Sequence, residues 1–156
     1  MSRIGKQPVL VPANVKVEVS GNTVRVEGPK GKLAQTFRPE VAVQFDAGKK
    51  AVIITRSNDE RQSRALHGLY RSLIANMVKG VVDGYQRRLK IEGIGYQARK
   101  DQTSVVLTVG YANAVQLTPP DGVTCDVPDP TTIVVKGADK QKVGQFAAEV
   151  RAARKP

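Results

Sequence analysis

The sequence is poor in the residues that most metal sites, disulfides and nucleophilic active sites require. Its 156 residues include one cysteine, one histidine, no tryptophan, four tyrosines and three phenylalanines. A single cysteine cannot form an intramolecular disulfide, and one cysteine with one histidine cannot supply the four ligands of a structural zinc ion. This residue usage favours a reducing compartment.

Long apolar runs are also missing. No stretch approaches the roughly 18 to 20 apolar residues that a membrane-spanning helix needs, because charged residues or glycines interrupt every candidate. The first residues include two basic side chains but lack the apolar segment of a secretory signal. We therefore expect a protein that is not exported by that route and that is soluble or peripheral to a membrane.

Positive charge, in contrast, is in excess. Lys and Arg number 25 against 14 Asp and Glu, so the formal net charge is +11. Such an excess points to a polyanionic partner, with nucleic acid as the first candidate and an anionic membrane surface as the second. The balance is +8 over residues 1–82 and +3 over residues 83–156.

Alternation of apolar and polar residues with period two predicts an antiparallel sheet in the first half. Ser20-Gly21-Asn22 and Gly28-Pro29-Lys30-Gly31 have the composition of turns between strands. We predict strands at residues 15–19, 23–27, 33–37, 41–45 and 51–55.

The apolar period becomes helical after Thr55. Residues 57–60 offer an N-cap followed by acidic residues, and Gly80 or Gly84 can end the helix. Arg61, Arg64 and Arg71 fall together on one side of this helix. The predicted core face is a different one and carries Leu66, Leu69, Tyr70, Leu73, Met77 and Val81.

The second half repeats this plan. Residues 133–141 can be laid over residues 53–61 without a gap, which places Asp139 over Asp59 as a second capping residue. Chance overlap between two α+β halves is the alternative explanation. We predict an α+β fold with two tandem duplicated domains, residues 1–82 and 83–156, each an antiparallel β-sheet packed against a helix. The second sheet would use strands at residues 88–91, 96–99, 105–109, 115–117 and 133–135.

The sequence contains no convincing motif for catalysis or cofactor binding. His67 falls in mid-helix without a recognisable nucleophile, and Cys125 falls in a strand-like stretch where a half-buried, inert thiol is expected. In residues 28–33, two residues separate the first glycine from the following Gly-Lys pair, whereas a phosphate-binding Walker loop has four residues there. We therefore predict no enzymatic activity, no cofactor and no metal.

Basic residues placed near glycines indicate binding to a nucleic-acid backbone rather than to base sequence. Gly93 and Gly95 lack side chains and would let the chain approach a partner closely. Tyr96 or Tyr111 can either stack on an unpaired base or pack in the core. The candidate RNA-binding residues are Arg3, Lys6, Arg88, Gly93, Gly95, Tyr96, Arg99, Lys100, Arg151, Arg154 and Lys155.

Several motifs in the same order closely resemble the bacterial-type family of ribosomal protein six of the large subunit, along nearly the whole chain. They are Met1–Lys6 with Pro8, then residues 26–31, 69–77, 92–96 and 140–145. The resemblance implies two duplicated α+β domains, no catalysis, and a structural role in subunit assembly and translation. It also implies binding to 23S-type rRNA near the factor-binding region, close to the sarcin-ricin loop and the stalk base. The implied partners are large-subunit rRNA, the ribosomal proteins of the stalk base, and elongation factors nearby, with no membrane partner. The implied location is the large ribosomal subunit in the cytoplasm.

Carried over from this family, the RNA contacts fall mainly on the second domain, at the turn of Gly93, Gly95 and Tyr96 and at the basic C-terminal end. Two departures limit the transfer. Gly110-Tyr111-Ala112-Asn113-Ala114 stands where the family usually has Gly-Tyr-Ser-His-Pro. The family's Pro-Tyr-Lys-Gly-Lys-Gly tail has no counterpart after Lys155-Pro156, so we expect a truncated sequence.

Two other functions fit the composition. A free-standing basic RNA-binding chaperone or regulator would show the same excess of charge, and a small enzyme would have to use Cys125 or His67. Co-sedimentation with the large subunit distinguishes the ribosomal protein from the chaperone.

Overall fold

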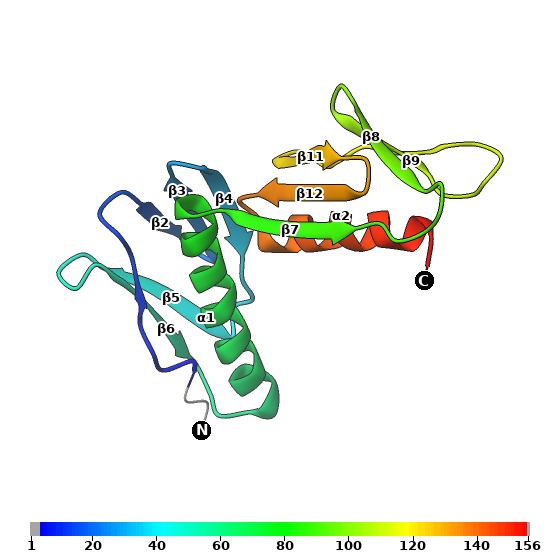
Figure 1. Cartoon of the computed structure of the whole chain (residues 1–156). Helices are drawn as coiled ribbons and strands as arrows, with labels where there is room; N and C mark the ends of the chain where they lie inside the picture. Colours follow the sequence, from blue (N-terminus) through cyan, green and yellow to red (C-terminus); the bar gives the residue numbers. More distant parts are fainter. Residues whose placement is uncertain (1–3, 156) are drawn as a thin grey trace. The chain divides into compact units, whose positions relative to one another are not determined.

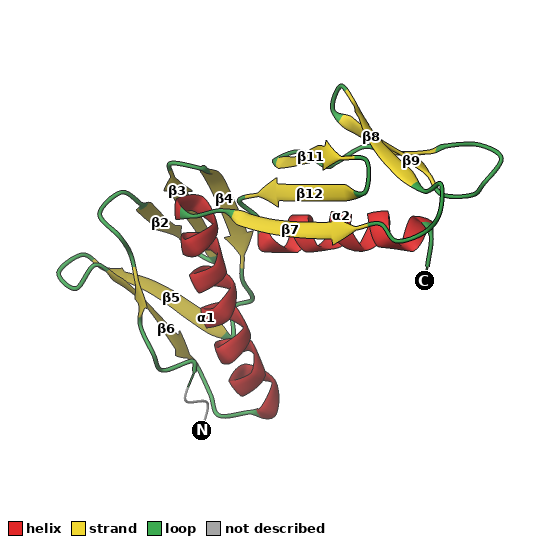
Figure 2. Ribbon diagram, viewed as in Figure 1, coloured by secondary structure: helices red, strands yellow, loops and turns green. Residues whose placement is uncertain are grey.

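The computed structural model describes residues 4–155, which divide between Asp83 and Gly84 into two units (Figures 1 and 2). Each unit contains one long helix and two three-stranded antiparallel sheets. The predicted α+β fold with two duplicated domains is confirmed.

The first unit builds its core between one helix and both of its sheets. Strands β2, β3 and β4 form a meander, whereas β5 and β1 pair with the two edges of β6. Alternation along β3 buries Val24 and Val26 completely and leaves Arg25 exposed. The helix α1 contacts β3 and β6, so it covers both sheets (Figure 1). The elements are β1 (Val9–Leu10), β2 (Lys16–Ser20), β3 (Thr23–Gly28), β4 (Gly31–Thr36), β5 (Val41–Asp46), β6 (Ala51–Arg56) and α1 (Arg61–Val82).

The second unit repeats the first, element for element. Strands β8, β9 and β10 form the meander, and β12 lies between β11 and β7, as β6 lies between β5 and β1. Helix α2 packs on β7 and β12 and buries Phe146 against Ile133 and Val135 (Figure 1). The elements are β7 (Tyr85–Lys90), β8 (Gln97–Asp101), β9 (Ser104–Thr108), β10 (Val115–Leu117), β11 (Val123–Asp129), β12 (Thr132–Gly137) and α2 (Lys140–Ala153).

The predicted start of the first helix is wrong. Helix α1 begins at Arg61, its N-cap Glu60 makes no side-chain capping bond, and its first turn holds no acidic residue. Asp59 instead accepts a 2.7 Å hydrogen bond from Arg56 Nε, which ties it to the end of β6. At the other end Gly84 follows the helix with φ of +76°, so the predicted stop at Gly84 holds and Gly80 lies inside the helix.

The predicted core face of α1 is also partly wrong. Leu69 is 50% exposed, whereas Ser63 and His67 are buried. His67 Nε2 lies 2.9 Å from the carbonyl oxygen of Ile54, so a polar ring can occupy the interior at little cost. Of the other predicted positions, Tyr70 and Val81 are buried and Leu66, Leu73 and Met77 are partly buried.

The two helix starts differ in a way that predicts different mutational costs. Asp139 Oδ1 accepts hydrogen bonds from the backbone N–H groups of Gln141 at 2.8 Å and Lys142 at 3.5 Å. We expect Asp139→Ala to lower the free energy of unfolding by about 1 kcal/mol, because it removes this cap. The matched change Glu60→Ala should have almost no effect, since Glu60 makes no such bond. Urea unfolding of both variants measures the difference, and equal losses would contradict it.

Candidate nucleic-acid interface

A hollow of about 580 Å³ in the second unit gathers basic side chains from distant parts of the sequence. It lies where β7 and the segment after it meet the C-terminal end of α2. Of the predicted RNA-binding residues, it brings together Arg88, Tyr96, Arg151, Arg154 and Lys155.

The local pattern of β7 and of the end of α2 explains why these cations are exposed. Arg88 is exposed and its neighbour Leu89 packs against the core, because successive strand residues point to opposite faces. In the last turn of α2, Val150 is buried and Arg151 is exposed. A cation there also interacts favourably with the C-terminal end of the helix dipole.

The net charge around the hollow is strongly positive. Lys90, which the sequence analysis did not select, also lines it, and its Nζ lies 3.1 Å from Glu92 Oε1. Among the described residues that line the hollow, Glu92 is the one carboxylate. Four further cations, Arg88, Arg151, Arg154 and Lys155, are therefore available to an anion.

The turn of Gly93 and Gly95 adjoins this hollow and is shaped by Tyr96. A Cβ on Gly93 would lie 2.7 Å from Tyr96 Cδ2, and one on Gly110 would lie 3.0 Å from Tyr96 Oη. Both glycines are therefore needed for the packing of Tyr96 within the unit. Gly95, with φ of +77° and no atom near its missing side chain, leaves open space for a partner. Ile94 between these glycines is fully exposed.

The structure separates the two tyrosines that the sequence left equivalent. Tyr96 is partly buried and packs against the core of the second unit, whereas Tyr111 is 48% exposed. The Arg154 guanidinium lies over the Tyr111 ring, 5.1 Å from its centroid. A hydrogen bond with Tyr111, and then electrostatic interaction with Tyr96, raise the pKa of Arg154. Tyr111 is not among the predicted RNA-binding residues, because the family resemblance favours the turn of Tyr96, and residue type alone does not distinguish the two rings.

The remaining predicted residues do not join this cluster. Arg3 lies outside the described residues, and Lys6 is exposed in the first unit. Arg99 is exposed on β8, and Lys100 forms a 2.8 Å ion pair with Asp126. The hydrogen bond from Lys100 is the main cause that lowers the pKa of Asp126. Since this carboxylate partly balances its charge, Lys100 is a weaker candidate for phosphate binding than Arg99.

A second hollow extends the positive surface along α2. It has a volume of about 740 Å³ and shares Arg151 and Lys155 with the first. Arg87 enters it from β7, and the small residues Gly144 and Ala148 leave the helix surface open there. The sequence pattern could not rank Arg87 above other cations, because its position opposite α2 depends on the fold.

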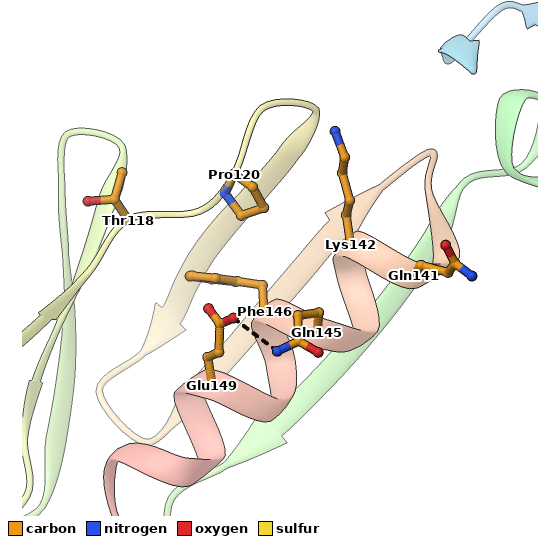
Figure 3. A pocket seen from close by; sticks show the side chains of 7 residues that line it. All are labelled: Thr118, Pro120, Gln141, Lys142, Gln145, Phe146 and Glu149. Carbon is orange, nitrogen blue, oxygen red and sulfur yellow. Dashed lines mark hydrogen bonds between the residues drawn. The ribbon is translucent and has the colours of Figure 1, made fainter. Parts of the chain in front are cut away.

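A third hollow, of about 510 Å³, has a different character (Figure 3). It lies between α2 and the segment that leads into β11, and it is lined by one cation and one carboxylate, Lys142 and Glu149. Lys142 Nζ donates to the carbonyl oxygen of Asp121 at 3.2 Å, and Gln145 Nε2 donates to Glu149 at 3.1 Å. Because these polar groups already have partners, this hollow is a poorer anion site than the first.

The groups that an enzyme would have to use are buried in structural roles. His67 lies beneath Gly5 and contacts the carbonyl oxygen of Ile54, and Cys125 is 2% exposed. Within residues 4–155, no group of three His, Cys, Asp or Glu side chains is placed to hold a metal ion. Neither helix in the described part of the chain is long and apolar enough to cross a bilayer.

The prediction that Cys125 is an inert thiol can be measured directly. Burial, followed by the charge of Asp126, raises the pKa of Cys125 to about 11. At pH 8 only about one molecule in a thousand would then carry the reactive thiolate. We expect a thiol reagent such as DTNB to leave the folded protein almost unmodified and to react fully in guanidinium chloride. Rapid labelling of the folded protein would contradict this environment.

Comparison with known proteins points to one family. Residues 11–84 and 92–156 match the family described as Ribosomal protein L6, once in each unit. The chain is 48% identical, over all of its residues and 85% of the relative, to the large ribosomal subunit protein uL6 of Carboxydothermus hydrogenoformans. It is 51% identical to the protein of the same name from Thermus thermophilus, over all of this chain and 86% of that relative. The protein of the same name from Geobacillus stearothermophilus is 49% identical, over all of this chain and 86% of that relative.

Proposed function

The chain belongs to the ribosomal protein L6 family, and on this premise we propose that its second unit binds 23S-type rRNA through the basic hollow. Membership confirms the resemblance found in the sequence and the prediction that the chain is not an enzyme. Its role is structural and belongs to the large ribosomal subunit, the assembly that its relatives are named for.

The clustering of cations around the hollow carries the proposal. Arg88 comes from β7, and Arg151, Arg154 and Lys155 come from the end of α2 and the residues that follow it. Guanidinium groups suit phosphate oxygens, because their planar fork of N–H groups can donate two parallel hydrogen bonds. A concentration of such groups binds RNA through its backbone and shape, without reading base sequence.

The proposed mechanism is electrostatic and predicts a steep dependence on salt. If the hollow and neighbouring cations neutralise about six phosphates, the logarithm of the binding constant should fall with a slope near −5 against the logarithm of salt concentration. Filter binding of the protein to large-subunit rRNA over a range of KCl concentrations measures this slope. A binding constant that does not change with salt would refute the proposal, since the release of counterions drives the proposed binding.

We place the contact near the factor-binding region, close to the sarcin-ricin loop and the stalk base, with the ribosomal proteins of the stalk base as neighbours. Support comes from the family to which the chain belongs. A hydroxyl-radical probe tethered to Ile94→Cys, in a Cys125→Ser background, should cut rRNA in these regions because Ile94 is fully exposed beside the hollow. Cuts confined to other regions of the RNA would contradict this location.

Sedimentation separates this role from that of a free RNA chaperone or regulator. A structural protein should migrate with the large subunit at about one copy per particle, whereas a chaperone should remain mostly in the soluble fractions. A chain found mostly free of subunits in growing cells would favour the chaperone.

A further inference from the structure

We propose that Tyr111 and Arg154 form a stacking platform for one unpaired RNA base at the edge of the basic hollow. The inference rests on the proposed rRNA-binding function and adds the form of RNA that the site takes. The ligand is a nucleotide whose base is extruded from its helix, with its phosphate on the neighbouring cations.

Exposure singles out Tyr111 among the aromatic residues of the described chain. Phe146 is buried, and Tyr70 packs against Phe37 in the first unit with ring centroids 4.6 Å apart. Tyr96 is partly buried, and Phe45, in the first unit, is 38% exposed against 48% for Tyr111. A half-exposed tyrosine beside a cationic hollow is the arrangement that stacks on single-stranded bases.

Arg154 adds a second planar group over the Tyr111 ring. Its guanidinium lies 5.1 Å from the Tyr111 ring centroid, and Arg154 itself lines the hollow. Bases stack on guanidinium planes as well as on aromatic rings, so one base can continue this stack on the exposed side of either group. The contact between the guanidinium and the ring reduces the freedom that Arg154 would lose on binding.

Tyr96 acts as the positioning residue for this platform. It packs beneath Gly93 on one loop and Gly110 on the other, and Gly110 directly precedes Tyr111. Its hydroxyl also interacts with Arg154. Both members of the platform are therefore held by a side chain that is anchored in the core of the unit.

Charge favours a nucleotide over an apolar side chain of a protein as the occupant. Arg151 and Lys155 line the same hollow as Arg154. An apolar side chain on Tyr111 would bring no anion to these cations, and covering them without one costs free energy. A nucleotide places a planar base and a phosphate within a few ångströms of each other, which matches a ring beside several cations.

Three variants test the platform in filter binding to large-subunit rRNA. We expect Tyr111→Leu to weaken binding about tenfold or more, because it removes the aromatic face. Tyr111→Phe keeps that face and loses only the hydroxyl, so binding should stay within about threefold. The matched control is Tyr85→Leu, since Tyr85 also lies beneath a cation, with Lys140 Nζ 5.8 Å from its ring centroid, but lies outside the hollow. The control should bind like the wild type, and no variant should change the salt slope, since none removes a cation.

Ultraviolet crosslinking of the wild-type complex provides a test that needs no variant. We expect a nucleotide adduct on the peptide that contains Tyr111, at a base that is unpaired in the RNA. An adduct at a paired base, or wild-type affinity for Tyr111→Leu together with no adduct, would overturn the platform. The proposed function would still stand if binding kept its steep salt dependence, whereas loss of that dependence in the wild type would refute both.

Discussion

Reversing the charge of Arg88 and Arg151 together should weaken binding to large-subunit rRNA by about a hundredfold or more at moderate salt. Both side chains are exposed and line the basic hollow from different elements, β7 and α2. Each charged hydrogen bond to a phosphate is worth roughly 1.5 to 3 kcal/mol, and a carboxylate in its place adds repulsion. The salt slope should also become shallower by about two units, one for each lost phosphate contact.

The control for this double variant is Lys49→Glu with Arg61→Glu in the first unit. It changes the net charge by the same amount, and both of its positions are exposed. Arg61 is the first residue of α1, where an acidic side chain is favourable to the helix dipole. We expect the control to bind within about threefold of the wild type. Equal losses for the two pairs would show that RNA responds to total charge and not to the hollow.

The net charge of each domain and the local charge around the hollow favour different domains as the RNA-binding one. Residues 1–82 carry the larger excess, +8 against +3 for residues 83–156. In the second unit, one carboxylate, Asp126, is already paired with two cations, Lys100 and Lys136. The cations left around the hollow face one carboxylate among its described lining residues, Glu92, and this already has Lys90 as its partner. The electrostatic potential at a bound phosphate depends more on the local cluster of cations than on the net charge of the whole domain.

Sequence patterns predict the strands well, because most strands are either half buried with alternating residues, as β3 is, or short apolar runs, as β9 is. Residues 115–117 were predicted as a strand and form β10, and the predicted strand at 41–45 forms β5 with one residue more. Burial along β3 follows its apolar alternation directly, whereas β6 buries the consecutive residues Ala51 and Val52. Strand β1 escaped prediction because two residues, Val9 and Leu10, are too few to show a period.

The errors arose where a polar residue takes a place that apolar periodicity assigns to the core. His67 occupies the interior because Ile54 supplies a hydrogen-bond acceptor, and that partner belongs to another element. The candidate interface depends in the same way on tertiary packing. Arg88 and Arg151 are far apart in the sequence and line one hollow because α2 packs on β7. No local pattern shows that Lys100 has an ion-pair partner in Asp126 or that Tyr96 is packed while Tyr111 is open.

The largest effect on stability should come from Phe146→Ala. Phe146 is 1% exposed and is among the largest fully buried side chains of the chain. Its loss should cost about 3 to 5 kcal/mol, from the lost burial and the cavity left behind. A unit of this size is stabilised by only about 4 to 10 kcal/mol, so the variant should leave the second unit close to unfolding.

Amide hydrogen exchange would show whether the two units respond separately. Among residues 4–155, the core that contains Phe146 is built from residues after Gly84, and the core that contains Ile74 is built from residues before Asp83. We therefore expect Phe146→Ala to lose protection throughout residues 84–155 while residues 4–83 keep theirs. Ile74→Ala should give the reverse pattern, because Ile74 is completely buried in the first unit. The first variant should also lose rRNA affinity, whereas folded molecules of the second should retain most of it. Uniform loss of protection in either variant would instead show a single cooperative unit, and the proposed domains would then be repeats of structure without independent stability.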